Sequence, residues 1–317
     1  MQWQSPPLTK LYSGGGSISV SLHGEKAVFS ELASTYPLKL LAPYIHDKTA
    51  LVYLLSYGGG LVGGDEVDLN VNVQRGARLL ILSQGTTKVF KTRIGRRQAS
   101  VHAKGLASGL PSSQHDTTAS LTQQTIAFRI APDSLLLLLP EPVTCFRDAS
   151  YHQRQTFHVE GNGSLVILDW ITSGRISRGE EWVFSRYHST NEVFHDGKRV
   201  AKDIMLLENQ ELGPHIPERP LRERLKPYSC YAMVIFYGPQ TRPILTDLAS
   251  RYDQITIFKE KTPAQLIWSL SPIEAEDQGA VVRVAGLETE IVKNWLKDSL
   301  SHLEEAVGRD LYRRAFV

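Results

Sequence analysis

The chain has 317 residues, 42% of them hydrophobic, and its 35 Lys and Arg nearly balance its 33 Asp and Glu. This composition excludes wholesale disorder and a polycationic nucleic-acid-binding protein, so we expect no nucleic-acid partner. Two cysteines are too few for a disulfide scaffold. No apolar run approaches the about 20 residues that cross a bilayer, and no secretory signal is evident at the N-terminus. We therefore expect a cytoplasmic protein without membrane contact.

Strand patterns dominate the first third of the chain. Apolar and polar side chains alternate over residues 17–22 and again over 67–73, which predicts strands with one buried face. Residues 51–57 and 79–82 are continuous apolar runs, typical of strands that are covered on both faces.

Turn signals follow in the middle of the chain. Residues 103–120 are rich in Ser, Gly and Thr and predict a surface loop or an insertion. Asn162-Gly163 and Asp196-Gly197 each lie between apolar runs and tolerate positive φ angles, so we predict a hairpin at each. Proline-rich residues 214–227 predict an extended connector.

Helical periodicity comes late. Apolar side chains recur at steps of four from Leu287 to Val307, which predicts an amphipathic helix over 287–308 that ends near Gly308. A shorter helix is expected after Pro243. The fold class is therefore mainly β, with about two α-helices, the main one near the C-terminus.

A glycine cluster follows the strand at 51–57. Gly58, Gly60 and Gly63 satisfy G-x-G-x-x-G, but a dinucleotide site also needs a helix next and an acid about 20 residues on. Here a strand pattern follows, and no Asp or Glu occurs from residue 69 to 115. We interpret the glycines as a strand-to-strand turn. Asp65, at the end of this turn, is the residue of the segment whose side chain could carry a chemical function.

The acid-free stretch carries many cations, with acidic residues elsewhere, such as those in 274–277, to balance them. It predicts outward-facing strand positions or, alternatively, a basic patch for an acidic partner. The cations are Arg75, Arg78, Lys88, Lys91, Arg93, Arg96, Arg97 and Lys104.

A second unusual segment spans residues 169–182. Its carboxylates could perform acid–base chemistry or bind a metal, and Asp65 with Glu180 could be the acid pair of a glycosidase. Alternatively, Asp169 and Glu180 pair with Arg175 or Arg178 in a strand-end network. The ten histidines are scattered without H-x-x-x-H spacing, so no tight zinc site is expected.

Four blocks together resemble one family, the urease accessory protein UreD, called UreH in some organisms. They occur in the family's order over about residues 13–314. The blocks are Gly58 to Asp65, Gln84 to Phe90, Leu139 to Pro142 with Phe146 and Gln153, and Gly174 to Glu180. The motif positions carried over are Gly58, Gly59, Gly60, Gly63, Gly64, Lys88, Pro140, Pro142, Gly174, Arg175 and Gly179.

The resemblance implies a single domain over residues 1–317, built as a superhelical stack of strands. It implies no enzymatic activity and no tightly bound cofactor. The expected role is GTP-dependent nickel insertion into apo-urease together with a UreF-type protein and a UreG-type GTPase, with Ni²⁺ as transient cargo. Asp65 and Glu180 are the expected transient nickel ligands, positioned by Lys88 and Arg175. The alternatives are a β-rich glycoside hydrolase that uses Asp65 and Glu180, and a metal-free protein-interaction module.

Overall fold

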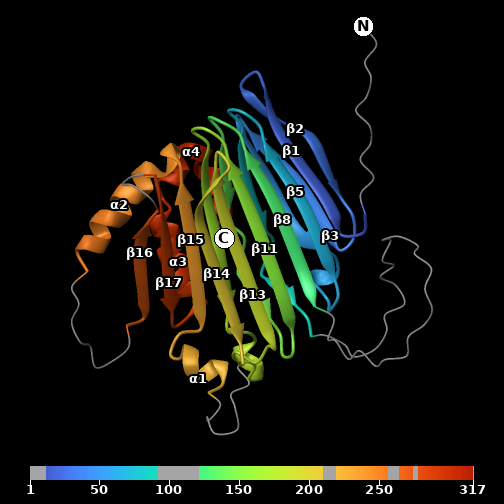
Figure 1. Ribbon diagram of the computed structural model, residues 1–317, viewed down its shortest axis with the longest axis vertical. Coiled ribbons are helices and arrows are strands. Elements are labelled where there is room, and N and C mark those ends of the chain that lie inside the picture. Colours follow the sequence, from blue (N-terminus) through green and yellow to red (C-terminus); the bar gives the residue numbers. More distant parts are fainter. Residues whose placement is uncertain (1–11, 92–120, 210–218, 256–263, 274–277, 317) are drawn as a thin grey trace.

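The computed structural model describes residues 12–91, 121–209, 219–255, 264–273 and 278–316 (Figure 1). The loop predicted over 103–120 and the acidic residues 274–277 lie outside this part. Two mixed β-sheets make up most of it, so the mainly β prediction is confirmed. Their strand orders are β14-β13-β11-β8-β5-β1-β2 in sheet A and β16-β17-β15-β12-β9-β6-β4-β3 in sheet B, with β7 and β10 beside the latter.

The elements have the following bounds. Sheet A holds β1 (Gly15–His23), β2 (Lys26–Ser34), β5 (Glu66–Val73), β8 (Thr122–Ile130), β11 (Ser150–Val159), β13 (Arg186–His195) and β14 (Lys198–Glu208). Sheet B holds β3 (Leu38–His46), β4 (Thr49–Ser56), β6 (Arg78–Ser83), β7 (Thr87–Val89), β9 (Leu135–Leu138), β10 (Val143–Cys145), β12 (Ser164–Thr172), β15 (Cys230–Tyr237), β16 (Leu266–Pro272) and β17 (Gly279–Gly286). The helices are α1 (Leu221–Leu225), α2 (Arg242–Asp253), α3 (Thr289–Ser299), α4 (Leu303–Val307) and α5 (Arg309–Arg314), with 3-10 turns at Tyr57–Gly59, Ile176–Arg178 and Pro239–Thr241.

The chain winds between the two sheets. It passes from β5 to β6, from β8 to β9 and from β11 to β12, each time from sheet A to sheet B. The successive strands pair in parallel: β5 with β8 and β8 with β11 in sheet A, and β6 with β9 and β9 with β12 in sheet B. This is the superhelical stack that the resemblance implied.

Of the two predicted hairpins, one is confirmed and one is wrong. Asp196 and Gly197, with φ angles of 46° and 83°, join the antiparallel strands β13 and β14. The turn at Asn162-Gly163 instead connects β11 in sheet A to β12 in sheet B. Each of these two strands finds its hydrogen-bonding partners in neighbouring coils of the stack rather than across the turn, because parallel pairing needs a long connection.

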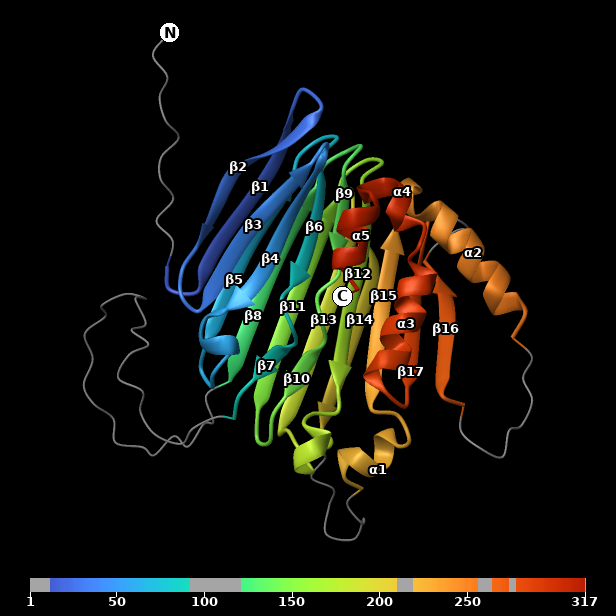
Figure 2. The same cartoon turned by 180° about the vertical axis from the view of Figure 1, so that it is seen from behind.

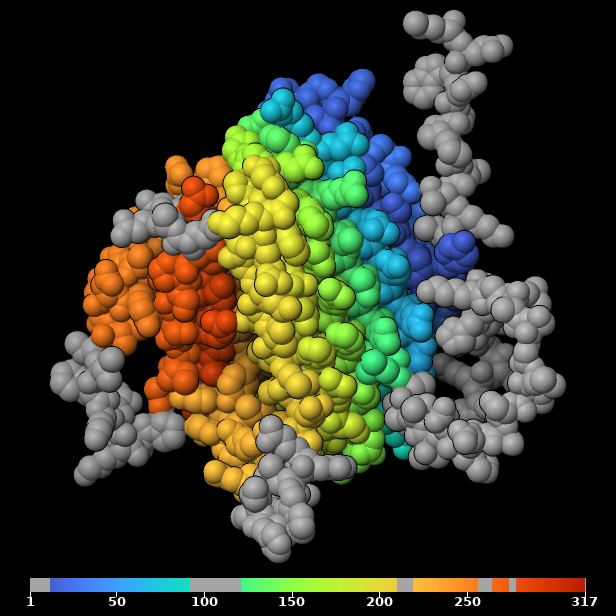
Figure 3. Space-filling model, viewed as in Figure 1, coloured from blue at the N-terminus to red at the C-terminus, as the bar shows by residue number. Residues whose placement is uncertain are grey.

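The middle of sheet B is covered on both faces, with α3, α4 and α5 on its outer side, whereas β3 at one edge of sheet B is largely exposed and the outer face of sheet A is open (Figures 2 and 3). In β6, Leu79 and Ile81 face the core between the sheets, and Leu80 and Leu82 face the core under the helices. The prediction from the continuous apolar run at 79–82 is therefore confirmed. In β5, buried and exposed residues alternate without exception, as expected of a strand with one solvated face.

The helix predicted over 287–308 is two helices, α3 and α4. The first ends at Ser299, whose hydroxyl accepts a hydrogen bond from Arg251 of α2, and the chain resumes helical geometry at Leu303. The turn between them allows Leu296 and Leu303 to enter the same core against sheet B, so the apolar spacing continues across the break. The helix after Pro243 is confirmed as α2. The connector predicted over 214–227 contains α1 in the part that the structure describes. No helix among the described residues is long and apolar enough to cross a membrane.

Candidate functional site

The glycine cluster forms a tight turn between β4 and β5. Gly58 and Gly59 have φ angles of 72° and 78°, in the left-handed region that favours glycine. A side chain at Gly60 would place its Cβ 2.6 Å from the carbonyl oxygen of Lys88. That carbonyl also accepts a 2.8 Å hydrogen bond from the N–H of Leu61, so Lys88 positions the turn through its backbone. The interpretation as a strand-to-strand turn is confirmed.

Asp65 closes this turn. Its Oδ2 accepts a 2.8 Å hydrogen bond from the N–H of Val62, and its own N–H donates to the Val62 carbonyl at 2.8 Å. The residue is buried, and its backbone carbonyl accepts the N–H of Gln123 at the start of β8. The carboxylate is therefore engaged in local loop structure.

Glu180 forms a bidentate ion pair with Arg175. The Glu180 carboxylate accepts hydrogen bonds from Nε of Arg175 at 2.8 Å and from Nη2 at 2.6 Å. The guanidinium lies 3.9 Å from the ring centre of Phe146, and Gly174 and Gly179 adopt φ angles of 118° and 69° at the ends of the loop. The hydrogen bonds from Arg175 hold the pKa of Glu180 below its usual value. For Glu180, the ion-pair interpretation is confirmed.

Asp169 is in a different environment. It lies in the middle of β12 and faces sheet A, where its Oδ1 accepts hydrogen bonds from Tyr187 at 3.2 Å and Gln153 at 3.4 Å. Its Oδ2 accepts hydrogen bonds from the Ser189 hydroxyl and, at 2.7 Å, from Nδ2 of Asn191. All four donors are neutral. In the described part of the chain no cation pairs with this carboxylate, so the predicted pairing of Asp169 with Arg175 or Arg178 is wrong.

Burial raises the pKa of Asp169, and the hydrogen bonds from Ser189, Asn191 and Tyr187 oppose this shift only in part. The residue is 7% exposed. A buried carboxylate without a counter-charge is costly, so a cation that reached it would be bound favourably.

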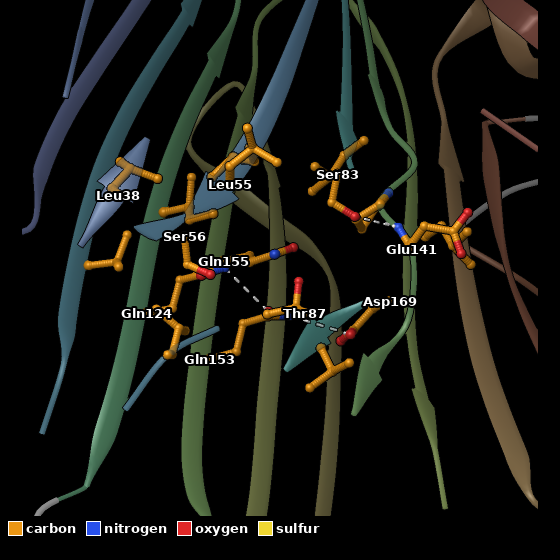
Figure 4. A pocket seen from close by; sticks show the side chains of 18 of the residues that line it. Leu38, Leu55, Ser56, Ser83, Thr87, Gln124, Glu141, Gln153, Gln155 and Asp169 are labelled. Carbon is orange, nitrogen blue, oxygen red and sulfur yellow. Dashed lines mark hydrogen bonds between the residues drawn. The ribbon is translucent and has the colours of Figure 1, made fainter. Parts of the chain in front are cut away.

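A cavity of about 60 Å³ lies beside Asp169, between the two sheets (Figure 4). It is large enough for roughly two water molecules. Gln124, Gln153 and Gln155 line it from sheet A, and Asp169 lines it from sheet B. Oε1 of Gln155 is buried and has no hydrogen-bond partner in the structure, and the same is true of Oδ1 of Asn191 next to Asp169.

The donor set around this cavity is oxygen-rich and carries two carboxylates, Asp169 and, at one edge, Glu141. Such a set suits a hydrated divalent cation and binds it weakly, because histidine and thiolate ligands are absent from the residues that line the cavity. Across the residues that the structure describes, no group of three or more His, Cys, Asp or Glu could hold a metal ion tightly. This arrangement of ligands is therefore suited to weak, reversible binding of a cation.

The sequence marks Asp169 as a candidate residue, but the ion pair expected for it is not the contact that it makes. The useful signal was its position, a single acid inside the otherwise apolar run from Leu165 to Ile171. In a strand buried on both faces, as all nine residues of β12 are, such an acid must lie in the core. Its neutral partners on β11 and β13 could not be inferred, because they come from other coils of the stack.

Comparison with known proteins places these features in a family context. A family model described as "UreD urease accessory protein" matches residues 13–315. The chain is 36% identical to "Urease accessory protein 4" of Cryptococcus neoformans var. grubii, over 94% of this chain and 92% of that protein. It is 30% identical to "Urease accessory protein D" of Arabidopsis thaliana, over 94% and 99%. It is 31% identical to "Urease accessory protein UreD" of Sorangium cellulosum, over 95% and 84%.

Proposed function

Since the chain belongs to the UreD family of urease accessory proteins, we propose that it promotes nickel insertion into apo-urease by conducting Ni²⁺ through the cavity between its sheets. The ion comes from a UreG-type GTPase, directly or through a UreF-type protein, and leaves toward the urease active site. The protein itself performs no turnover in this proposal.

The observation that carries the proposal is the unpaired carboxylate of Asp169 beside a water-sized cavity. A conduit needs stops that attract Ni²⁺ without retaining it. The Asp169 carboxylate with several amide and hydroxyl oxygens meets that requirement, whereas nitrogen and sulfur ligands would bind nickel much more tightly. In this proposal Asp169 is the main stop. The role expected of Asp65 and Glu180 stays a prediction, which Asp65→Ala and Glu180→Ala test in the same assay.

The glycosidase alternative is weaker. A general acid needs a raised pKa, whereas the pKa of Glu180 is lowered by its pairing with Arg175. Asp65, the other acid of that pair, is bonded to the backbone of its own turn. Turnover of a glycoside panel by the isolated protein would revive this alternative.

The metal-free binding module rests on the basic stretch after residue 74. Two of its cations are engaged within the molecule, Arg75 in a 3.2 Å ion pair with Asp133 and Arg78 with the carbonyl of Ala306. Four of the others, Arg93, Arg96, Arg97 and Lys104, lie outside the described residues. Complexes formed by this stretch would weaken steeply with salt and would be insensitive to Asp169→Asn.

The experiment is co-expression of apo-urease with the UreF-type and UreG-type proteins, with and without this chain, followed by measurement of urease nickel content and activity. We expect nickel loading and activity only when the chain is present. Equal loading without it would refute the proposed function.

A further inference from the structure

Sheet B is interrupted next to Asp169. Strand β6 stops at Ser83 and its neighbour β9 stops at Leu138, while β7 and β10 resume the two paths at Thr87 and Val143. Two adjacent strands therefore end close together, since Leu138 pairs with Ile81, two residues before the end of β6. Pro140 and Pro142 lie in one of the breaks, and neither has an N–H with which to continue a ladder.

The edges of this interruption are fixed by hydrogen bonds. The N–H of Glu141 donates to Oγ of Ser83 at 2.8 Å, and the N–H of Thr87 donates to the Pro142 carbonyl at 3.1 Å. Nε1 of Trp170 on β12 donates to the Pro140 carbonyl at 2.8 Å. The interruption of sheet B therefore has edges that hydrogen bonds hold in place, unlike a frayed strand end. We call these edges the frame.

Open space lies on both sides of the frame. On one side is the cavity with Asp169, and on the other is a surface hollow of about 630 Å³ that includes Gln84, Gly85 and Thr86. Ser83 and Glu141 line both spaces, so these two residues form the partition between them. Figure 4 shows them joined at one side of the cavity, with Asp169 below.

Glu141 forms an ion pair at this partition. Its Oε1 lies 3.1 Å from Nζ of Lys293 on α3, and the two side chains are only 21% and 16% exposed. An ammonium in this place neutralises the carboxylate and opposes a cation that approaches from the hollow. A divalent ion has to displace it to reach Glu141.

We propose that this opening is the port by which Ni²⁺ crosses sheet B, with the Glu141 carboxylate as the ligand at its mouth and Lys293 as the cation that the ion displaces. This rests on the proposed function and names a residue that the motif positions left without a role. In this proposal the Leu-Pro-Glu-Pro block has a functional role. Its two prolines interrupt the strand pairing of sheet B, and the acid between them is the ligand at the mouth of the port. The ion then passes from Glu141 to Asp169.

The proposal predicts opposite effects for the two partners of one ion pair. Glu141→Gln removes the ligand and keeps the frame, since the bond to Ser83 uses the backbone N–H. Lys293→Met removes the competing charge. We expect Glu141→Gln to raise the nickel concentration for half-maximal urease activation about threefold to tenfold, and Lys293→Met to lower it by a similar factor.

The test is a nickel titration of urease activation in cells that co-express each variant with the complete accessory set, with thermal unfolding of each purified variant as the check on folding. Glu304→Gln is the matched control, because Glu304 forms a surface ion pair with Arg309 outside the lining of the cavity. A purely structural ion pair predicts that Glu141→Gln and Lys293→Met shift activation in the same direction. That result, or an unchanged titration for Glu141→Gln, would overturn the port.

The two proposals fail separately. If Asp169→Asn blocks loading and Glu141→Gln does not, the port is wrong and the conduit stands. If urease is loaded equally well without the chain, the proposed function itself fails.

Discussion

Two buried acids, Asp169 and Glu180, have partners of different charge. Glu180 is 8% exposed and pairs with the guanidinium of Arg175, whereas Asp169 is 7% exposed and, among the described residues, accepts hydrogen bonds from hydroxyl and amide groups. Burial raises the pKa of Asp169, and the ion pair lowers that of Glu180. Membership in a family motif therefore does not mark the acid that lacks a counter-charge. The motif acid Glu180 is already paired, and the acid outside the motif is not.

The largest effect on stability is expected when the counter-charge of Glu180 is removed. Arg175→Met leaves a largely buried carboxylate unpaired, and we expect a loss of about 1–3 kcal/mol in the free energy of unfolding, reduced by solvent at the loop surface. Urea denaturation measures it. The double variant Arg175→Met/Glu180→Gln should recover most of the loss; if it does not, charge pairing is not what Arg175 contributes.

The same logic applied to Asp169 predicts the opposite sign. Asp169→Asn removes a buried charge without a partner, and Asn191 can turn its amide so that its unpartnered Oδ1 accepts from the new amide group. We expect no loss of stability at neutral pH and a gain of about 1 kcal/mol. Urea denaturation beside the wild type decides this, and a loss larger than about 1 kcal/mol would show that the carboxylate is well compensated.

The pH dependence of stability should separate the two acids further. Because the folded pKa of Asp169 is raised, the folded state holds more protons, and its contribution falls as pH rises from about 3.9 through the folded value. Because the folded pKa of Glu180 is lowered, its contribution is present above about 4.3 and is lost as pH falls through the folded value. We expect urea denaturation of Asp169→Asn and Glu180→Gln, from about pH 3 to about pH 8, to show this contrast. The difference in free energy of unfolding between each variant and the wild type should change with pH in opposite directions for the two variants. Parallel changes would contradict the contrast.

The smallest effect is expected at Asp65, whose carboxylate accepts a hydrogen bond from the Val62 N–H. Asp65→Ala should cost about 0.5–1.5 kcal/mol through the lost hydrogen bond, and Asp65→Asn less, because its amide oxygen can accept the same N–H. Thermal unfolding of the two variants measures the difference. Urease activation by the folded Asp65 variants tests the nickel role predicted for this residue: a block would support the role, and activation near wild type would refute it.

The fold could be predicted from the sequence where the pattern was local. The alternation in residues 67–73 and the apolar run at 79–82 showed how many faces each strand buries, and Asp196-Gly197 marked a true hairpin. The Asn162-Gly163 turn has the same local chemistry, but its two flanking strands pair with other coils. Which strands pair is decided by contacts far apart in the chain, so the turn residues alone could not settle it.

The candidate site was harder to predict for the same reason. The Arg175–Glu180 pair spans five residues and was among the alternatives that the sequence offered. The partners of Asp169 come from β11 and β13, and the interruption of sheet B at Glu141 arises because the neighbouring strands β6 and β9 end close together. These arrangements arise only when the coils stack, so they leave no spacing in the sequence.

The decisive measurement is the nickel content of urease co-expressed with the accessory proteins and the Asp169→Asn variant, with the Glu304→Gln control measured alongside. We expect a folded Asp169→Asn protein that leaves urease largely free of nickel, and normal loading with Glu304→Gln. Full loading with a folded Asp169→Asn variant would contradict the central claim that the unpaired carboxylate between the sheets is a stop on the nickel route.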